Sequence, residues 1–142
     1  MIDQSYGEWV TFFEMNHSFH ISKLEKDWLG NWKLVHWDGE PGFIGGAAMD
    51  LSNNDGVILG ASSITNDHEN KHTSFYYGMI ANSKVDQIKL EKKEWTDKNV
   101  ALIETERYRF FFYVAYDRLD PFSLQALSNG EVIQQFGGGI PD

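Results

Sequence analysis

The sequence contains no cysteine. Disulfides, thiolate nucleophiles and cysteine-based zinc sites are therefore excluded, and side-chain packing must hold the fold together. No apolar run approaches the roughly 18 residues of a membrane-spanning helix. The first residues lack the basic and apolar regions of a signal peptide, as they also would in a chain whose leader had been removed.

Basic residues are scarce as well: 12 lysines and arginines face 21 aspartates and glutamates, which gives a formal net charge of −9. This charge repels phosphate backbones, and no stripe of lysine or arginine compensates for it. We therefore expect no nucleic-acid partner. An anionic membrane surface is disfavoured for the same reason.

What the chain does contain is typical of a globular β protein. Its 142 residues suit a single domain, 42% of them are hydrophobic, and 15% are aromatic. Apolar residues alternate with period two in many short segments, and turn residues separate these segments. The expected strands span residues 6–15, 19–25, 32–37, 43–51, 57–64, 75–81, 85–91, 100–104, 108–116, 122–127 and 131–136.

Two of these strands are apolar on both faces, which is typical of a central strand. One is Trp32–Trp37, and the other, Tyr108–Tyr116, is expected at the centre of the core, between two layers. Residues 65–73 and 92–99 are expected as polar connections. Asn129-Gly130 is the clearest hairpin turn, because both residues tolerate a positive φ.

The best internal boundary is Asp38–Gly42, which holds two glycines and a proline and has no periodicity. It divides the single domain 1–142 into two lobes that share a core, a β-meander at 6–37 and a β-sandwich at 43–137. The predicted fold class is therefore all-β: an antiparallel β-sandwich preceded by a short β-meander.

Catalytic and metal-binding patterns are weak. His68 and His72 stand four residues apart, a spacing that would bring two imidazoles together on a helix, but the segment is predicted as a loop without a third ligand. Asp55 and Ala61 stand where a calcium loop starting at Asp50 needs glycine and glutamate. No catalytic, cofactor-binding or metal-binding residue is predicted, and a hydrolase that uses either histidine is a distant alternative.

The aromatic residues give the clearest positive signal. Most are expected to pack in the core, because tryptophan and tyrosine bury large areas. The functional alternative is an exposed platform for a sugar, a peptide or a partner protein. Trp37 at a strand end and Trp95 in a loop are the candidates for this aromatic binding surface.

Three stretches also carry a resemblance to a known group of proteins. The chain resembles small, uncharacterised secreted or membrane-anchored proteins of Gram-positive spore-forming bacteria, which usually have a leader or membrane segment upstream. This resemblance implies an all-β domain outside the cytoplasm and no established catalytic residues. The stretches are Trp9-Val10-Thr11-Phe12-Phe13-Glu14 with Gly30-x-Trp32-Lys33-Leu34-Val35, Phe75-Tyr76-Tyr77-Gly78-Met79-Ile80-Ala81-Asn82 with Val85 and Ile88, and Ala101-Leu102-Ile103 with Arg109-Phe110-Phe111-Phe112 and Leu124-x-Ala126-Leu127-x-x-Gly130-x-Val132-Ile133.

A second resemblance rests on Gly30-Asn31-Trp32, which is similar to the Gly-x-Trp of the first strand of lipocalins. It implies an alternative fold, a lipocalin-like β-barrel that holds an apolar ligand. The boundary near Pro41 argues against a continuous barrel.

Two functions follow as alternatives. The favoured one is a non-enzymatic, extracytoplasmic binding module for a protein, a peptide or a cell-envelope component. The other is a carrier of a small apolar ligand, which requires an open apolar pocket of several hundred cubic ångströms. The expected location is outside the cytoplasm or at the cell surface if a leader was removed, and the cytoplasm otherwise.

Overall fold

The chain folds as antiparallel β structure, and the part of it that the structure describes contains no helix. The all-β prediction is therefore confirmed. At positions 2, 3, 66 and 95–98 only the backbone is described. The computed structural model describes residues 2–3, 9–50, 55–66, 69, 71–92, 95–119 and 121–137.

Two compact units divide the chain, Met1–Met49 and Asp50–Asp142. This division falls later than the expected boundary, because strand β5 (Gly45–Ala48) pairs with a strand of the first unit. The boundary predicted from the sequence places this segment in the sandwich lobe. A Cβ atom on Gly46 would lie 2.5 Å from the carbonyl oxygen of Phe19, so the missing side chain lets β5 approach its partner strand closely.

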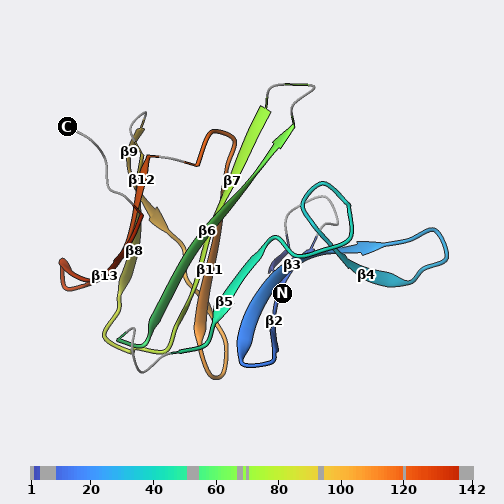
Figure 1. The fold of residues 1–142 in the computed structure, drawn as a ribbon. Coiled ribbons are helices and arrows are strands. Elements are labelled where there is room, and N and C mark those ends of the chain that lie inside the picture. Colours follow the sequence, from blue (N-terminus) through green and yellow to red (C-terminus); the bar gives the residue numbers. More distant parts are fainter. Residues whose placement is uncertain are drawn as a thin grey trace. The chain divides into compact units, whose positions relative to one another are not determined.

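The first unit is one sheet in which β3 is the longest strand (Figure 1). Its strands follow the order β1-β2-β3-β4, and a two-residue turn at Asn16-His17, with φ of 53° and 58°, joins β2 to β3. Strand β2 occupies one edge of β3. Strands β4 and β5 therefore lie one after the other along the second edge of β3. The strands are β1 (Ile2–Asp3), β2 (Trp9–Met15), β3 (Ser18–Lys26) and β4 (Trp32–Val35).

Ser22 stabilises the point where β4 gives way to β5. Its hydroxyl is fully buried and lies 2.9 Å from the carbonyl oxygen of Val35 and 3.0 Å from that of Gly42. A buried carbonyl without a partner is costly, so this shared hydrogen bond replaces the ladder bonds that are interrupted here.

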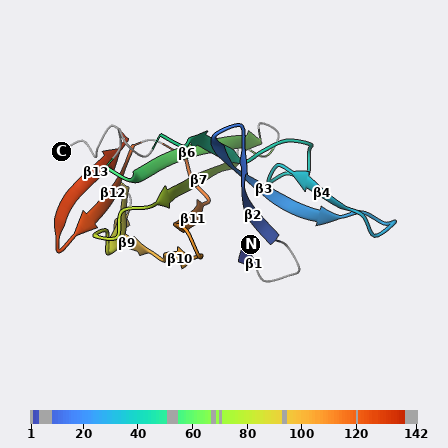
Figure 2. The same ribbon diagram turned by 90° about the horizontal axis from the view of Figure 1, so that it is seen from below.

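The second unit is a β-sandwich of two four-stranded sheets (Figures 1 and 2). One sheet has the strand order β10-β11-β7-β6, and the other has the order β13-β12-β8-β9. Strand β6 lies near β13, and β11 lies near β9. The strands are β6 (Val57–Asn66), β7 (Lys71–Ile80), β8 (Gln87–Lys92), β9 (Trp95–Val100), β10 (Ile103–Glu104), β11 (Arg109–Ala115), β12 (Phe122–Ser128) and β13 (Glu131–Phe136).

Apolar side chains from both sheets fill the space between them. This packing confirms the predicted sandwich. The lipocalin-like alternative does not hold, since the strands form separate open sheets and no closed barrel in the described residues. The buried cluster comprises Val57, Leu59, Tyr76, Ile80, Val85, Ile88, Leu90, Val100, Phe111, Ala115, Phe122, Leu124 and Ala126.

The centre of the core is β7, so the prediction that the Tyr108–Tyr116 run is buried on both sides was wrong. Every residue from Ser74 to Ile80 is buried, whereas in β11 only Phe111 and Ala115 are. Long strands flank β7 on both edges, but the outer edge of β11 meets only the two-residue β10. Beyond the end of β11, Tyr116 is 77% exposed.

Three local expectations also need correction. Residues 95–100 form a strand paired with β8 rather than a loop. Residues 65–66 and 71–73, predicted as part of a loop, belong to strands, because the polar ends of β6 and β7 continue their backbone ladder. Trp32–Val35 is an outer strand with three exposed residues and not a central one.

Among the described residues, no helix has the length and hydropathy needed to cross a membrane.

Candidate functional site

The two tryptophans predicted as a binding surface belong to different units. Trp37 follows β4 and is half-buried, with the Nζ atom of Lys23 5.4 Å from its ring centre. Lys23 also donates a hydrogen bond of 3.5 Å to the carbonyl oxygen of Trp37. Trp95 begins β9, but its side chain lies outside the described part of the chain. A role for this pair stays a prediction.

The histidine pair is only half described. His68 lies outside the described residues, whereas His72 lies in β7, where its Nδ1 is 3.1 Å from the hydroxyl oxygen of Thr65. Within the described ranges, no group of three or more His, Asp or Glu side chains could hold a metal ion. The described geometry therefore provides no metal site around His72.

The loop between β3 and β4 is held in a defined shape by Asp27. One carboxylate oxygen of Asp27 accepts hydrogen bonds of 2.9 Å from the backbone N–H groups of Leu29 and Asn31. The backbone of Asp27 bonds to Asn31 at 2.9 Å and to Gly30 at 3.0 Å, and Gly30 has a φ of 87°. These contacts fix the loop, so Trp28 is presented from an ordered turn.

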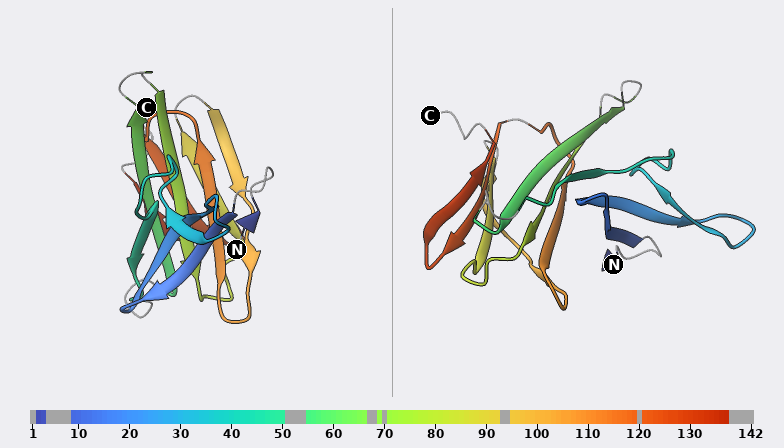
Figure 3. Two further views of the ribbon diagram at one scale, coloured as in Figure 1. Left: turned by 90° about the vertical axis from the view of Figure 1, so that its right-hand side faces the viewer. Right: turned by 60° about the horizontal axis from the view of Figure 1, so that its bottom comes forward.

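Apolar side chains project from this ordered loop and from the start of β4. Trp28 is 91% exposed, Leu29 65% and Trp32 54%. We call these three residues the hairpin tip; Figure 3 shows the hairpin of β3 and β4 that carries it. Exposure of a single apolar residue is ordinary, but three within five positions, two of them tryptophans, are typical of a contact surface.

One face of the stem below the hairpin tip carries apolar side chains and a lysine. Leu24 pairs with Leu34, and Lys26 pairs with Trp32, so these four side chains share one face. The Nζ atom of Lys26 lies 5.7 Å from the centre of the Trp32 ring. The exposed face of the hairpin therefore combines apolar surface with a cation beside its aromatic ring.

A buried lysine organises a polar network in the second unit. The Nζ atom of Lys92 lies 2.8 Å from the hydroxyl of Tyr76 and 2.8 Å from Oδ1 of Asp117, and it also donates to the carbonyl oxygens of Arg118 and Leu119. Its side chain is 5% exposed. The ammonium group is saturated by acceptors, so it holds the 117–119 segment in place rather than facing solvent.

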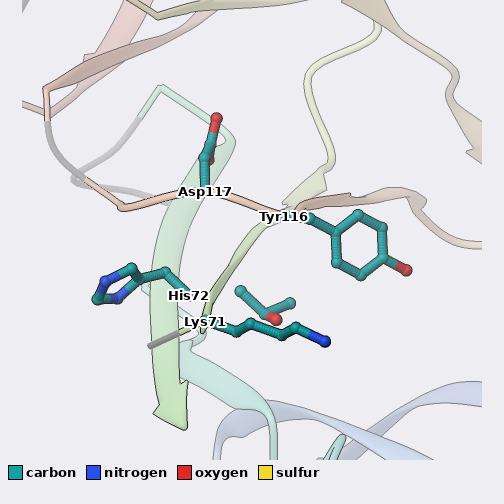
Figure 4. Close-up of a pocket in the computed structure, with 5 residues that line it drawn as sticks. Lys71, His72, Tyr116 and Asp117 are labelled. Atoms are coloured by element: carbon teal, nitrogen blue, oxygen red, sulfur yellow. The ribbon is translucent and has the colours of Figure 1, made fainter. Parts of the chain in front are cut away.

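A hollow of about 460 Å³ lies next to this network. It is lined by Lys71, His72, Thr73, Tyr116 and Asp117. In Figure 4 the His72 ring points to one side, while Tyr116 and Lys71 extend to the other. The polar groups among the described lining residues do not converge on one point, so these residues form no arrangement suited to acid–base or nucleophilic catalysis.

Comparison with known proteins adds no assignment: no family model, no curated protein and no solved structure matches the chain. The resemblances to secreted proteins of spore-forming bacteria and to lipocalins therefore remain predictions.

The hairpin tip is the candidate site. It was not predicted from the sequence, because a Trp and a Leu lie in a turn, where polar residues are usual. The signal that could have found it is Asp27 followed by two large apolar residues and Gly30.

Proposed function

We propose that this chain is a non-enzymatic, extracytoplasmic binding module for a protein, a peptide or a cell-envelope component, and that the hairpin tip is its contact. The location outside the cytoplasm follows from the resemblance to secreted and membrane-anchored proteins. The contact itself follows from the geometry of the loop between β3 and β4.

One observation supports the proposal most directly: a tryptophan that is 91% exposed sits on a loop fixed by four hydrogen bonds. Exposed apolar surface on an ordered loop loses little conformational entropy when it is covered, so binding is favoured. Tryptophan is also the residue type most enriched among those that dominate binding energies.

The carrier alternative has less support. The described lining of the hollow beside Asp117 includes the ionisable side chains of Lys71, His72 and Asp117. The space between the two sheets is occupied by the buried cluster of the sandwich. We therefore favour the binding module.

Co-sedimentation with isolated cell envelopes of a Gram-positive bacterium tests the proposal. The unaltered chain is expected to sediment with the envelopes, and the double variant Trp28→Ser/Leu29→Ser is expected to remain in solution. The matched control is Tyr116→Ser/Val132→Ser, which removes an aromatic and an aliphatic side chain that are 77% and 44% exposed elsewhere.

Equal sedimentation of the tip variant and the unaltered chain would contradict the proposal. The same conclusion would follow if the control variant lost binding as strongly as the tip variant.

A further inference from the structure

We infer that the hairpin tip inserts into the headgroup region of a lipid bilayer and forms a reversible membrane contact. This inference rests on the proposed function and names its partner chemistry: a neutral, zwitterionic lipid surface. The argument uses the charge, the shape and the residue types of the hairpin.

The distribution of charge along the hairpin matches the layers of a bilayer. Residues 28–32 carry no charge, and the next exposed charged side chains toward the stem are Lys26, Lys33 and Glu25, the last of which pairs with Lys33. Asp27 is the closest acid, but its carboxylate already accepts two backbone N–H groups. With the tip in the acyl boundary, the two lysines reach the level of the lipid phosphates.

The residue types of the tip suit the same environment. Tryptophan is enriched at membrane interfaces because its ring is apolar and its N–H group is polar. Trp28 and Trp32 supply two such rings, and Leu29 supplies an aliphatic chain between them. Burial of these side chains removes apolar surface from water, which favours a weak and reversible contact.

The shape of the hairpin favours lipid over a protein partner. A stable protein interface buries about 800 Å² on each side and involves roughly 20–30 residues. The exposed apolar surface at the end of the hairpin comes from Trp28 and Leu29 in the turn and from Trp32 at the start of β4, with Leu34 farther along the same strand. A bilayer requires no complementary groove, so this small convex surface can be covered completely.

The test is flotation of the full chain with vesicles of pure phosphatidylcholine. The unaltered chain is expected to float with the vesicles. Trp28→Ser/Leu29→Ser is expected to lower the partition constant about a hundredfold, since two buried side chains are lost. The control Tyr116→Ser/Val132→Ser is expected to partition as the unaltered chain does.

A second measurement uses the unaltered chain and does not depend on how the variants fold. Lipids brominated along the acyl chain are expected to quench part of its tryptophan fluorescence, because Trp28 reaches the acyl boundary. No quenching together with no flotation would overturn the inference.

Failure of the membrane inference and failure of the binding-module proposal can be told apart. If the chain binds envelopes through the hairpin tip but ignores lipid vesicles, the membrane inference fails and the binding-module proposal stands with a protein or polysaccharide partner. If the chain binds neither envelopes nor vesicles, both fail.

Discussion

Lys92 shows that the environment of a side chain can differ from the environment that its neighbours in the sequence indicate. It is the last residue of β8, at the start of the 92–99 segment whose charged residues predict a solvated connection. The structure instead buries it against Tyr76 and Asp117, which lie 16 and 25 positions away in the sequence. Local patterns carry no information on partners at such distances, so this network could not be predicted.

Replacing Lys92 with methionine is expected to destabilise the second unit by about 2 kcal/mol, because Asp117 and two carbonyl groups lose their buried donor. The carboxylate of Asp117 is 26% exposed, which keeps the loss below that of a fully buried pair. Urea denaturation followed by circular dichroism measures it.

The control is Lys89→Met, since Lys89 forms a 3.4 Å ion pair with Glu91 in which both side chains are more exposed. Its loss is expected to stay below about 1 kcal/mol. Equal effects of the two substitutions would contradict the structural role of Lys92.

At the scale of elements, the hairpin of β3 and β4 depends on one carboxylate. Asp27→Ala removes the acceptor of the Leu29 and Asn31 amides, so the tip loses its fixed shape while the strands remain paired. Hydrogen exchange at these two amides is expected to accelerate about tenfold, since bonds to a charged acceptor contribute roughly 1.5 kcal/mol or more.

Asp38→Ala is the matched control for this measurement. The side chain of Asp38 accepts from the backbone N–H of Glu40, at 3.0 Å, in the neighbouring loop, and its Oδ1 lies 3.8 Å from Nδ1 of His36. Its substitution is expected to leave exchange at Leu29 and Asn31 unchanged. Similar exchange in the Asp27 variant and the unaltered chain would show that the loop keeps its shape without this carboxylate.

Elements with local signals could be predicted from the sequence. The Asn129-Gly130 turn joins β12 to β13 with φ of 51° and 83°, as its residue types indicate. Strand pairing could not be predicted, because β5 joins β3 rather than β6 through a close backbone approach at Gly46. An apolar run such as Trp32–Val35 is compatible with a central strand and with an exposed hairpin, and only the tertiary structure decides between them.

At the scale of the whole molecule, the net charge of −9 opposes approach to any anionic surface. At an ionic strength of about 0.01 M the screening length is roughly 30 Å, so the field of the entire chain acts on a vesicle. Adding anionic lipid to the vesicles is therefore expected to weaken binding at low salt. Raising the salt concentration is expected to restore it, because counterions screen the repulsion between the acidic chain and the anionic surface.

Flotation at low and high salt, with and without anionic lipid, measures this effect. Stronger binding to anionic vesicles at low salt would show that local cations and not the apolar tip dominate the interaction.

The central claim is that the exposed apolar residues of one hairpin form the contact of this chain with its partner. Hydroxyl-radical footprinting of the full chain, free and bound to cell envelopes, tests it most directly. The account predicts that oxidation of Trp28 and Leu29 falls on binding while oxidation of Tyr116 stays the same. Equal oxidation of Trp28 in the free and bound chain would contradict it.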